Sequence, residues 1–421
     1  MASSPGWSPS PQASWVESFN ALGTNLGDAG LRSLVSLSEA ELLEAAQRAT
    51  GLIDFGDDGF RDGLRRLLAA LEEEARLNLL GRLLARQEIQ RLLQTRLQIR
   101  AAFTASPQIG EEEIRAPIFV TGLARTGTTF LHELFTADDR NRVPMLWEAM
   151  YPAPPPEAAA ANTDPRIAAA DREIRIMDEI VPAFPSMHEN RGDLPTECIF
   201  LLAQEFATDL FSGAYEIPSY SAWMSTTDKV ASYRAHRRLL QLLQFRHRRE
   251  RWVLKAPSHL AQLDALFEVY PDAHVVITHR DPLRVLGSLT NLMAVLRGMR
   301  SDHVDHEAVV WQMSLGYEML VAKVLQQRAD GVLPEDRILD VAYRDLVADP
   351  VGTVRRVYDR VGVALPDRIR GQIQAHVQGR PKDKRGLHEY DFADTGLDPQ
   401  AERAKYADYQ QRYGVPSELE P

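Results

Sequence analysis

The residues that most clearly suggest chemistry form a short loop, Gly122-Leu-Ala-Arg-Thr-Gly-Thr-Thr129. The apolar run from Ile118 to Val120 predicts a buried strand before it, and apolar residues at helical spacing predict a helix after it. In such a strand-turn-helix layout, backbone N–H groups and the positive end of the helix face an anion, and glycines let the backbone approach closely. Arg125 adds a positive charge, and three threonines add hydroxyl donors. The loop therefore predicts a phosphate-binding site.

The loop departs from the nucleoside triphosphatase pattern, which is G-x-x-x-x-G-K-[ST]. The spacing from Gly122 to Gly127 is kept, but Thr128 stands where that pattern has lysine. The cation of this loop is Arg125, which precedes the second glycine. We therefore interpret the loop as a site for a phosphate group, and not for transfer of the γ-phosphoryl of Mg-ATP. An ordinary strand-to-helix turn is the alternative, which the arginine and the threonines disfavour.

Two further predicted strands end in side chains that could do chemistry. Trp252–Leu254 leads into Lys255-Ala-Pro-Ser-His259, and His274–Thr278 leads into His279-Arg280. Strands that alternate with helices imply a largely parallel sheet, whose ligands bind beyond the carboxyl ends of the strands. The predicted fold class is therefore α/β, with a P-loop-like parallel sheet flanked by helices. We expect the three strand ends to converge on one edge.

Three regions of the chain differ in pattern. Residues 1–30 begin with a Pro/Ser-rich run and are predicted to be a flexible tail. Residues 31–115 contain amphipathic runs and predict a helical N-terminal extension, which either covers the domain behind it or forms a homodimer surface. Residues 116–421 are predicted to be the α/β domain. No chemistry is assigned to the extension.

The composition excludes several classes of protein. A net charge of -11 argues against a nucleic-acid partner or an anionic membrane surface, although not against a local basic pocket. The single cysteine, Cys198, excludes an internal disulfide framework and a multi-cysteine metal site. The N-terminal residues lack the apolar core of a secretory signal, and no apolar run is long enough to be a transmembrane segment. We expect a cytoplasmic protein.

Two later features complete a recognisable set of motifs. Ser288 follows Arg280 by eight residues, and Tyr343-Arg-Asp-Leu follows a predicted strand, Ile338–Ala342. With the loop and the Lys255 segment, these residues resemble sulfotransferases that use 3′-phosphoadenosine 5′-phosphosulfate, in the bacterial branch with a helical N-terminal extension. The resemblance covers roughly residues 116–397. It implies the sulfotransferase fold and transfer of a sulfuryl group, with no metal, to a hydroxyl of a small-molecule, lipid or glycan acceptor.

The resemblance also implies a role for each motif. The 5′-phosphosulfate would be bound by the loop residues Arg125, Thr126, Gly127, Thr128 and Thr129. Arg280 and Ser288 match the pair that binds the 3′-phosphate, and Tyr343 matches a tyrosine that contacts adenine. Lys384 and Arg385 approximately match a segment that closes over the 3′-phosphate.

The catalytic groups follow from the chemistry of sulfuryl transfer. Charge develops on the leaving 5′-phosphate, and Arg125 and Lys255 can stabilise it. The acceptor hydroxyl needs a base, and a neutral histidine suits that task near physiological pH. His259 is the first candidate because of its motif, although a helix-capping or core histidine is the alternative interpretation. His188, in a polar loop, is the second candidate.

Carboxylates are further candidates for the base. Glu189 lies in the same polar loop as His188, as does Glu197, and Glu148 follows an apolar run. Some sulfotransferases use a carboxylate base, so we include Glu148 and Glu189. For Glu189 and Glu197 a capped helix start with solvated charges is an equally good interpretation.

Two other functions share part of the pattern. A P-loop kinase of a nucleotide or small molecule would begin with the same strand, loop and helix, but the missing loop lysine counts against it. A non-catalytic phosphonucleotide-binding module would keep the donor site and lose the catalytic groups. The presence of Arg125, Lys255, His259, Arg280 and Ser288 argues against that loss.

Overall fold

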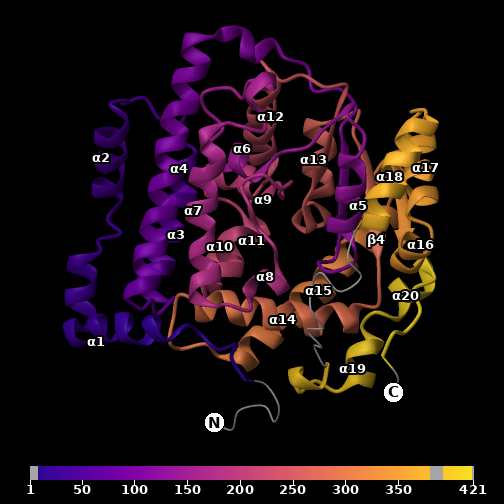
Figure 1. Cartoon of the computed structure of the whole chain (residues 1–421). Helices are drawn as coiled ribbons and strands as arrows, with labels where there is room; N and C mark the ends of the chain where they lie inside the picture. Colours follow the sequence, from indigo (N-terminus) through magenta and orange to yellow (C-terminus); the bar gives the residue numbers. More distant parts are fainter. Residues whose placement is uncertain (1–7, 380–391, 420–421) are drawn as a thin grey trace.

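A computed structural model describes residues 8–379 and 392–419 (Figure 1). Five strands form one sheet in the order β2-β3-β1-β4-β5, and each neighbouring pair is parallel. The strands are β1 (Ile118–Gly122), β2 (Asn141–Arg142), β3 (Arg251–Lys255), β4 (His274–His279) and β5 (Ile338–Ala342). The parallel sheet of the predicted α/β class is thereby confirmed.

Helices make up most of the remaining described residues. The first four are α1 (Ser14–Leu34), α2 (Glu39–Thr50), α3 (Phe60–Glu73) and α4 (Leu79–Ala105). The next are α5 (Thr128–Thr136), α6 (Leu146–Met150), α7 (Pro165–Ile180), α8 (Phe184–Met187), α9 (Ile199–Leu202), α10 (Asp209–Ala214), α11 (Pro218–Thr226), α12 (Val230–Gln244) and α13 (Leu263–Val269). The last are α14 (Pro282–Gly298), α15 (His306–Ala329), α16 (Tyr343–Ala348), α17 (Pro350–Arg360), α18 (Asp367–Gly379), α19 (Pro399–Ala404) and α20 (Ala407–Tyr413).

The central strand β1 is buried along its whole length, because helices cover both faces of the sheet (Figure 1). Side chains of a strand alternate between its two faces. Ile118 and Val120 pack with apolar residues of α5, α17 and α18. Phe119 packs on the opposite face with residues of α12, α13 and α15. This alternation fixes the strand and directs the loop after it to the edge of the sheet.

The carboxyl ends of the strands meet at that edge. Val120 of β1 pairs with Lys255 at the end of β3, and Gly122 pairs with Thr278 near the end of β4. His279 in turn pairs with the last residue of β5, directly before Tyr343. The expectation that the strand ends converge on one edge is confirmed.

The N-terminal helices pack closely against the rest of the chain. Apolar residues of α2, α3 and α4 share one core with residues of α10 and α11. A Cβ atom at Gly63 of α3 would lie 2.6 Å from the carbonyl oxygen of Phe206. A Cβ atom at Gly81 of α4 would lie 1.9 Å from the carbonyl oxygen of Arg300, just after α14. Only glycine allows backbones to approach so closely at these two contacts.

The expectation of a flexible tail over residues 1–30 is wrong from Ser14 onward, where α1 begins. The reason is a tertiary contact. Val16 is buried in a core cluster with Ile180 and Met299, which lie far along the chain. The Pro/Ser-rich composition at the start of the chain gives no sign of these partners.

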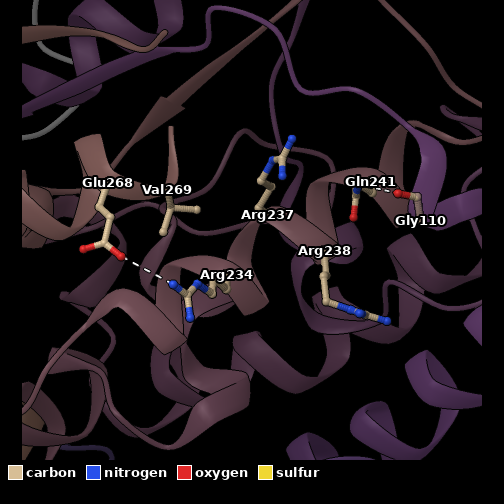
Figure 2. Close-up of a pocket in the computed structure, with 7 residues that line it drawn as sticks. All are labelled: Gly110, Arg234, Arg237, Arg238, Gln241, Glu268 and Val269. Atoms are coloured by element: carbon tan, nitrogen blue, oxygen red, sulfur yellow. Dashed lines mark hydrogen bonds and ion pairs between the residues drawn. The ribbon is translucent and has the colours of Figure 1, made fainter. Parts of the chain in front are cut away.

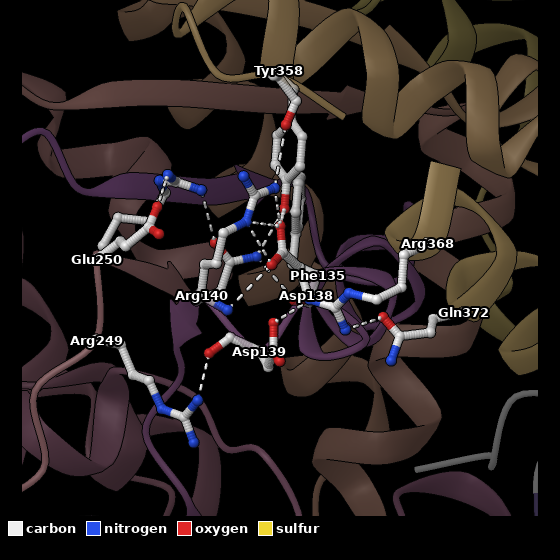
Figure 3. Close-up of polar contacts among 12 residues, drawn as sticks. Phe135, Asp138, Asp139, Arg140, Arg249, Glu250, Tyr358, Arg368 and Gln372 are labelled. Carbon is white, nitrogen blue, oxygen red and sulfur yellow. Dashed lines mark hydrogen bonds and ion pairs between the residues drawn. The ribbon is translucent and has the colours of Figure 1, made fainter. Parts of the chain in front are cut away.

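A polar cluster around the buried carboxylate of Asp138 holds the turn that follows the loop helix α5 (Figure 3). The Asp138 carboxylate accepts hydrogen bonds from the Arg140 guanidinium, at 2.6 Å, and from the Tyr358 hydroxyl, at 2.7 Å. Asp139 pairs with Arg368 of α18 at 2.9 Å. Burial alone would raise the pKa of Asp138, but the bonds from Arg140 and Tyr358 outweigh it and lower that pKa. The cluster thus joins the end of α5 to α17 and α18.

Candidate active site

The backbone of the loop after β1 adopts conformations that few residues with a side chain allow. Gly122 has φ 149° and Gly127 has φ 91°, both in the region that favours glycine. A Cβ atom at Gly122 would lie 2.5 Å from the carbonyl oxygen of Thr278, and one at Gly127 would lie 2.9 Å from the Tyr343 ring. Arg125 also has a positive φ, 68°, which is uncommon for a residue with a side chain. Such strain concentrates at ligand sites.

The threonines of the loop differ in their contacts. The Thr126 hydroxyl donates to the carbonyl oxygen of Leu123 at 2.6 Å and lies 2.6 Å from the hydroxyl of Thr278. It therefore shapes the loop from inside. Thr128 and Thr129 begin α5, so their backbone N–H groups belong to the first turn of a nine-residue helix.

Four of the residues predicted to bind the donor lie together. Arg125 donates through Nε to the hydroxyl of Ser288 on α14, at 3.1 Å. Arg280, just after β4, donates through Nη1 to the carbonyl oxygen of Arg125, at 3.3 Å. The guanidinium carbon of Arg280 lies 4.1 Å from the centre of the Tyr343 ring. Residues from the ends of β4 and β5 and from α14 thus meet at the loop.

Arg280 also holds a carboxylate of the chain itself. Its Nε donates to Oε1 of Glu418 at 2.9 Å, and its Nη2 donates to Oε2 at 2.7 Å. The backbone N–H of Glu418 donates to Asp281 at 2.7 Å. No sequence motif pointed to this pair, whose members are 138 residues apart. Lys384 and Arg385, the other predicted ligands of the 3′-phosphate, lie outside the described residues.

Lys255 sits between the loop helix and a carboxylate. Its ammonium lies 2.5 Å from Oε1 of Glu197 and donates to the Thr129 hydroxyl at 3.3 Å. Burial alone would raise the pKa of Glu197, but the charges of Lys255 and then His188 outweigh it and lower that pKa. Lys255 is therefore no exposed strand-end lysine, since its side chain is 3% exposed. The sequence placed Glu197 in a polar loop and did not reveal this pairing.

His259 lies in an aromatic core. It is 0% exposed, its Nδ1 is 2.7 Å from the Tyr233 hydroxyl, and its ring packs edge-on against Phe119 at 5.0 Å between centroids. Burial, and then the charges of His236 and Lys255, lower its pKa well below the usual range. Its Nε2 has no hydrogen-bond partner among the described residues. The ring is neutral and is shielded from solvent.

His188 has a different setting, at the end of α8. It is partly exposed, and the carbonyl oxygen of the preceding residue, Met187, accepts a hydrogen bond from Nη1 of Arg125 at 3.2 Å. His188 is also close enough to Glu197 for its charge to lower the pKa of that carboxyl. The structure thus brings His188 next to the loop residue Arg125 and the Lys255–Glu197 pair.

The two carboxylates predicted as alternative bases have less suitable positions. Glu148 is buried and forms a two-pronged ion pair with Arg142, at 2.5 and 2.9 Å. Its oxygens also accept from the backbone of Met145. Glu189 is exposed. Within residues 8–379 and 392–419, no group of three or more His, Cys, Asp or Glu side chains could hold a metal ion.

A basic depression of about 400 Å³ lies elsewhere on the molecule, along α12 (Figure 2). Its lining residues are Gly110, Arg234, Arg237, Arg238, Gln241, Glu268 and Val269. Arg234 pairs with Glu268 at 3.4 Å, and the Arg238 guanidinium lies over Phe103 at 4.4 Å. The arginines point in different directions, and none of the predicted site residues lines this depression.

Known proteins resemble the chain in sequence over more than half of its length. Residues 117–367 match the model of the Sulfotransferase family. Two proteins named omega-hydroxy-beta-dihydromenaquinone-9 sulfotransferase Stf3, from Mycobacterium bovis and Mycobacterium tuberculosis, are each 30% identical over 259 residues. The match covers 59% of this chain and 63% of each relative, so the chain spans less than two thirds of their length.

Solved structures resemble the chain over nearly all of their length. Sulfotransferase STF1 from Mycobacterium tuberculosis H37Rv superimposes with a TM-score of 0.78 at 33% identity, over 88% of this chain and 98% of the other. Sulfotransferase STF9 from Mycobacterium avium superimposes with a TM-score of 0.83 at 25% identity, over 91% of this chain and 98% of the other. Since each match covers more of the chain than residues 116–421, each extends into the helical N-terminal region.

Proposed function

Because the chain belongs to the sulfotransferase family, we propose that it transfers the sulfuryl group of 3′-phosphoadenosine 5′-phosphosulfate to a hydroxyl of an apolar, lipid-like acceptor. The observation that carries the proposal is the convergence of the loop, Ser288, Arg280 and Tyr343 on one edge of the sheet. The family match favours neither a P-loop kinase nor a non-catalytic binding module.

The residues at this edge suit a donor with two phosphate positions. The first turn of α5 offers backbone N–H groups and the positive end of a helix, which suits the 5′-phosphosulfate. Arg280 and Ser288 suit the 3′-phosphate, and the Arg280 guanidinium already holds an anionic group, the Glu418 carboxylate. The Tyr343 ring, packed beside Gly127, suits contact with adenine.

The proposed step moves one group between two oxygens. The acceptor oxygen forms a bond to sulfur while the bond from sulfur to the 5′-phosphate oxygen breaks, and the electron pair of that bond stays on the phosphate. The hydroxyl proton passes to a base. Lys255, Arg125 and the N–H groups of the loop stabilise the negative charge that develops on the leaving phosphate, because preorganised donors act strongly in a site with little water.

We propose His188 as the base in preference to His259. His188 is partly exposed and neighbours Arg125, whereas His259 is buried against Tyr233 and Phe119. His188→Gln should lower kcat by about 10²- to 10⁴-fold, the usual value of general-base catalysis, without changing donor affinity. His259→Gln should act mainly on stability. The reverse pattern in paired steady-state kinetics and thermal melts would make His259 the base.

An apolar acceptor is proposed for two reasons. The relatives named above are called sulfotransferases of a hydroxylated dihydromenaquinone. In this chain, Phe184 and Met187, directly before His188, belong to an apolar cluster with Val295 of α14. We propose that an apolar acceptor reaches His188 beside this cluster, whose Phe184 and Met187 side chains are themselves buried.

Isothermal titration with 3′-phosphoadenosine 5′-phosphate, the product of the donor, tests the proposal. The wild type should bind it, Arg280→Ala should lose most of that binding, and Mg-ATP should not bind. Arg344→Ala is a matched control, because Arg344 is an exposed arginine next to Tyr343 that pairs only with Asp345 among the described residues. Binding of Mg-ATP without binding of the bisphosphate would refute the sulfotransferase function and favour the kinase. Turnover is then measured with ³⁵S-labelled donor and long-chain alcohols.

A further inference from the structure

Glu197 occupies an unusual position for a carboxylate. It lies at the end of a polar loop, 58 residues before Lys255, and its Oε1 is 2.5 Å from the Lys255 ammonium. The two side chains are 15% and 3% exposed. A backbone bond reinforces the pair, because the N–H of Cys198 donates to the carbonyl oxygen of Lys255 at 2.8 Å. Glu197 and Lys255 are therefore fixed to each other through both side chains and backbone.

Stability alone does not explain such a pair. Removing two charges from water costs about as much free energy as their attraction returns, so apolar residues would often serve folding as well. The pair does, however, determine where the Lys255 ammonium lies. Lys255 also donates to Thr129, which lies in the first turn of α5 beside the loop. An ammonium has three donors, so with one on Glu197 and one on Thr129 a third remains for an oxygen of the sulfuryl donor.

The groups that face Glu197 argue against a role as the base itself. They are Lys255 from β3, His188 from the loop after α8, and His132 from α5. Burial, and then the charge of Lys255, lower the pKa of His132 to about 4, so that ring is neutral. The positive neighbours stabilise the Glu197 carboxylate and make it a weak base. Its geometry suits holding a cation in place.

We propose that Glu197 is a positioning residue of the sulfuryl-transfer site, which holds the Lys255 ammonium beside Thr129, where it meets the leaving phosphate oxygen. This inference rests on the proposed function. Without the carboxylate, the lysine side chain has several rotamers of similar energy, and the ammonium spends less time near the loop. Glu197 acts through Lys255, so its effect should disappear when the lysine is absent.

The test is a double-mutant cycle on the full chain, with ³⁵S turnover and titration of the bisphosphate product. Glu197→Gln should lower kcat by about 10- to 100-fold, as is typical for a residue that orients a catalytic group, and leave bisphosphate affinity within about threefold. Lys255→Met should lower kcat by about 10²- to 10³-fold. The double variant should match Lys255→Met within about threefold, because both changes remove the same interaction. Asp193→Asn, which removes the charge of an exposed carboxylate in the same loop, should leave kcat unchanged.

The outcomes separate this inference from the proposed function. Losses that multiply in the double variant, or an unchanged kcat in Glu197→Gln, would overturn the positioning role while the wild type still transfers sulfuryl groups. A wild type that neither binds the bisphosphate nor turns over would overturn both. If Glu197→Gln does not fold, Glu197→Asp serves instead. It keeps the charge but draws it back by one methylene, so kcat should fall less than in Lys255→Met, with bisphosphate affinity unchanged.

Discussion

The pairing of Arg280 with Glu418 predicts that one substitution should tighten donor binding. Glu418 occupies the Nε–Nη2 side of the Arg280 guanidinium, the side best suited to a two-pronged bond with a phosphate. A 3′-phosphate must therefore displace the carboxylate before it can use that side. Glu418→Gln keeps the size of the side chain and removes its charge, so the competition should weaken.

The expected size of the effect follows from the exposure of the pair. Arg280 is 20% exposed and Glu418 is 29% exposed, so the pair is neither fully solvated nor deeply buried. Solvated ion pairs contribute about 0.2–1 kcal/mol, and a two-pronged, partly buried pair belongs near the upper end, about 1 kcal/mol. Because 1.4 kcal/mol corresponds to a factor of ten, release of this pair should raise bisphosphate affinity about fivefold.

Isothermal titration of the wild type and Glu418→Gln with 3′-phosphoadenosine 5′-phosphate measures this change. Asp408→Asn is the matched control, because Asp408 is an exposed acid of α20 and its loss changes the net charge equally. The difference between Glu418→Gln and the control should shrink with added salt, which screens the competing pair. Equal or weaker binding by Glu418→Gln would refute the competition and mean that Glu418 supports the bound state by orienting Arg280.

Two further substitutions test the loop and its support. Gly127→Ala should abolish most bisphosphate binding, because its Cβ would lie 2.9 Å from the Tyr343 ring and a φ of 91° strains any residue with a side chain. Titration of the variant with the bisphosphate measures the loss, and an unchanged circular dichroism spectrum shows that the variant is folded. Asp138→Asn should lower the free energy of unfolding by about 1–3 kcal/mol at pH 7, because it weakens buried bonds to Arg140 and Tyr358. The pKa of Asp138 is lower in the folded than in the unfolded protein, so its contribution to stability is complete above the unfolded pKa, about 4, and is lost as the pH falls through the folded pKa. In urea titrations, the difference in free energy of unfolding between the wild type and Asp138→Asn should therefore disappear in acid. A difference that persists in acid would contradict the assignment.

The sequence predicted features that depend on local pattern. The strand that ends at Gly122, the helix that begins at Thr128 and the parallel sheet all follow from short-range periodicity and glycine placement. The nearness of Arg125 to Ser288 follows from the rule that parallel strands end at one edge. These features needed no knowledge of distant contacts.

Other features depend on partners far along the chain. Helix α1 is held by contacts of Val16 that composition does not reveal. The core position of His259 depends on Tyr233 of α12, which no motif links to it. The carboxylates that pair with Lys255 and Arg280 come from segments without a recognisable pattern, so only the folded chain shows them.

The contact at Gly81 bears on how the protein can be divided. The backbone of α4 meets the carbonyl of Arg300, directly after the helix that carries Ser288, with no space for even one methyl group between them. Asn78 at the start of α4 also donates to that carbonyl at 3.1 Å. The N-terminal helices therefore cannot be exchanged as a separate module among related enzymes unless the backbone contact between Gly81 and Arg300 is also changed. Calorimetry should record one cooperative melting transition for the whole chain, and Gly81→Val should lower its midpoint instead of splitting it.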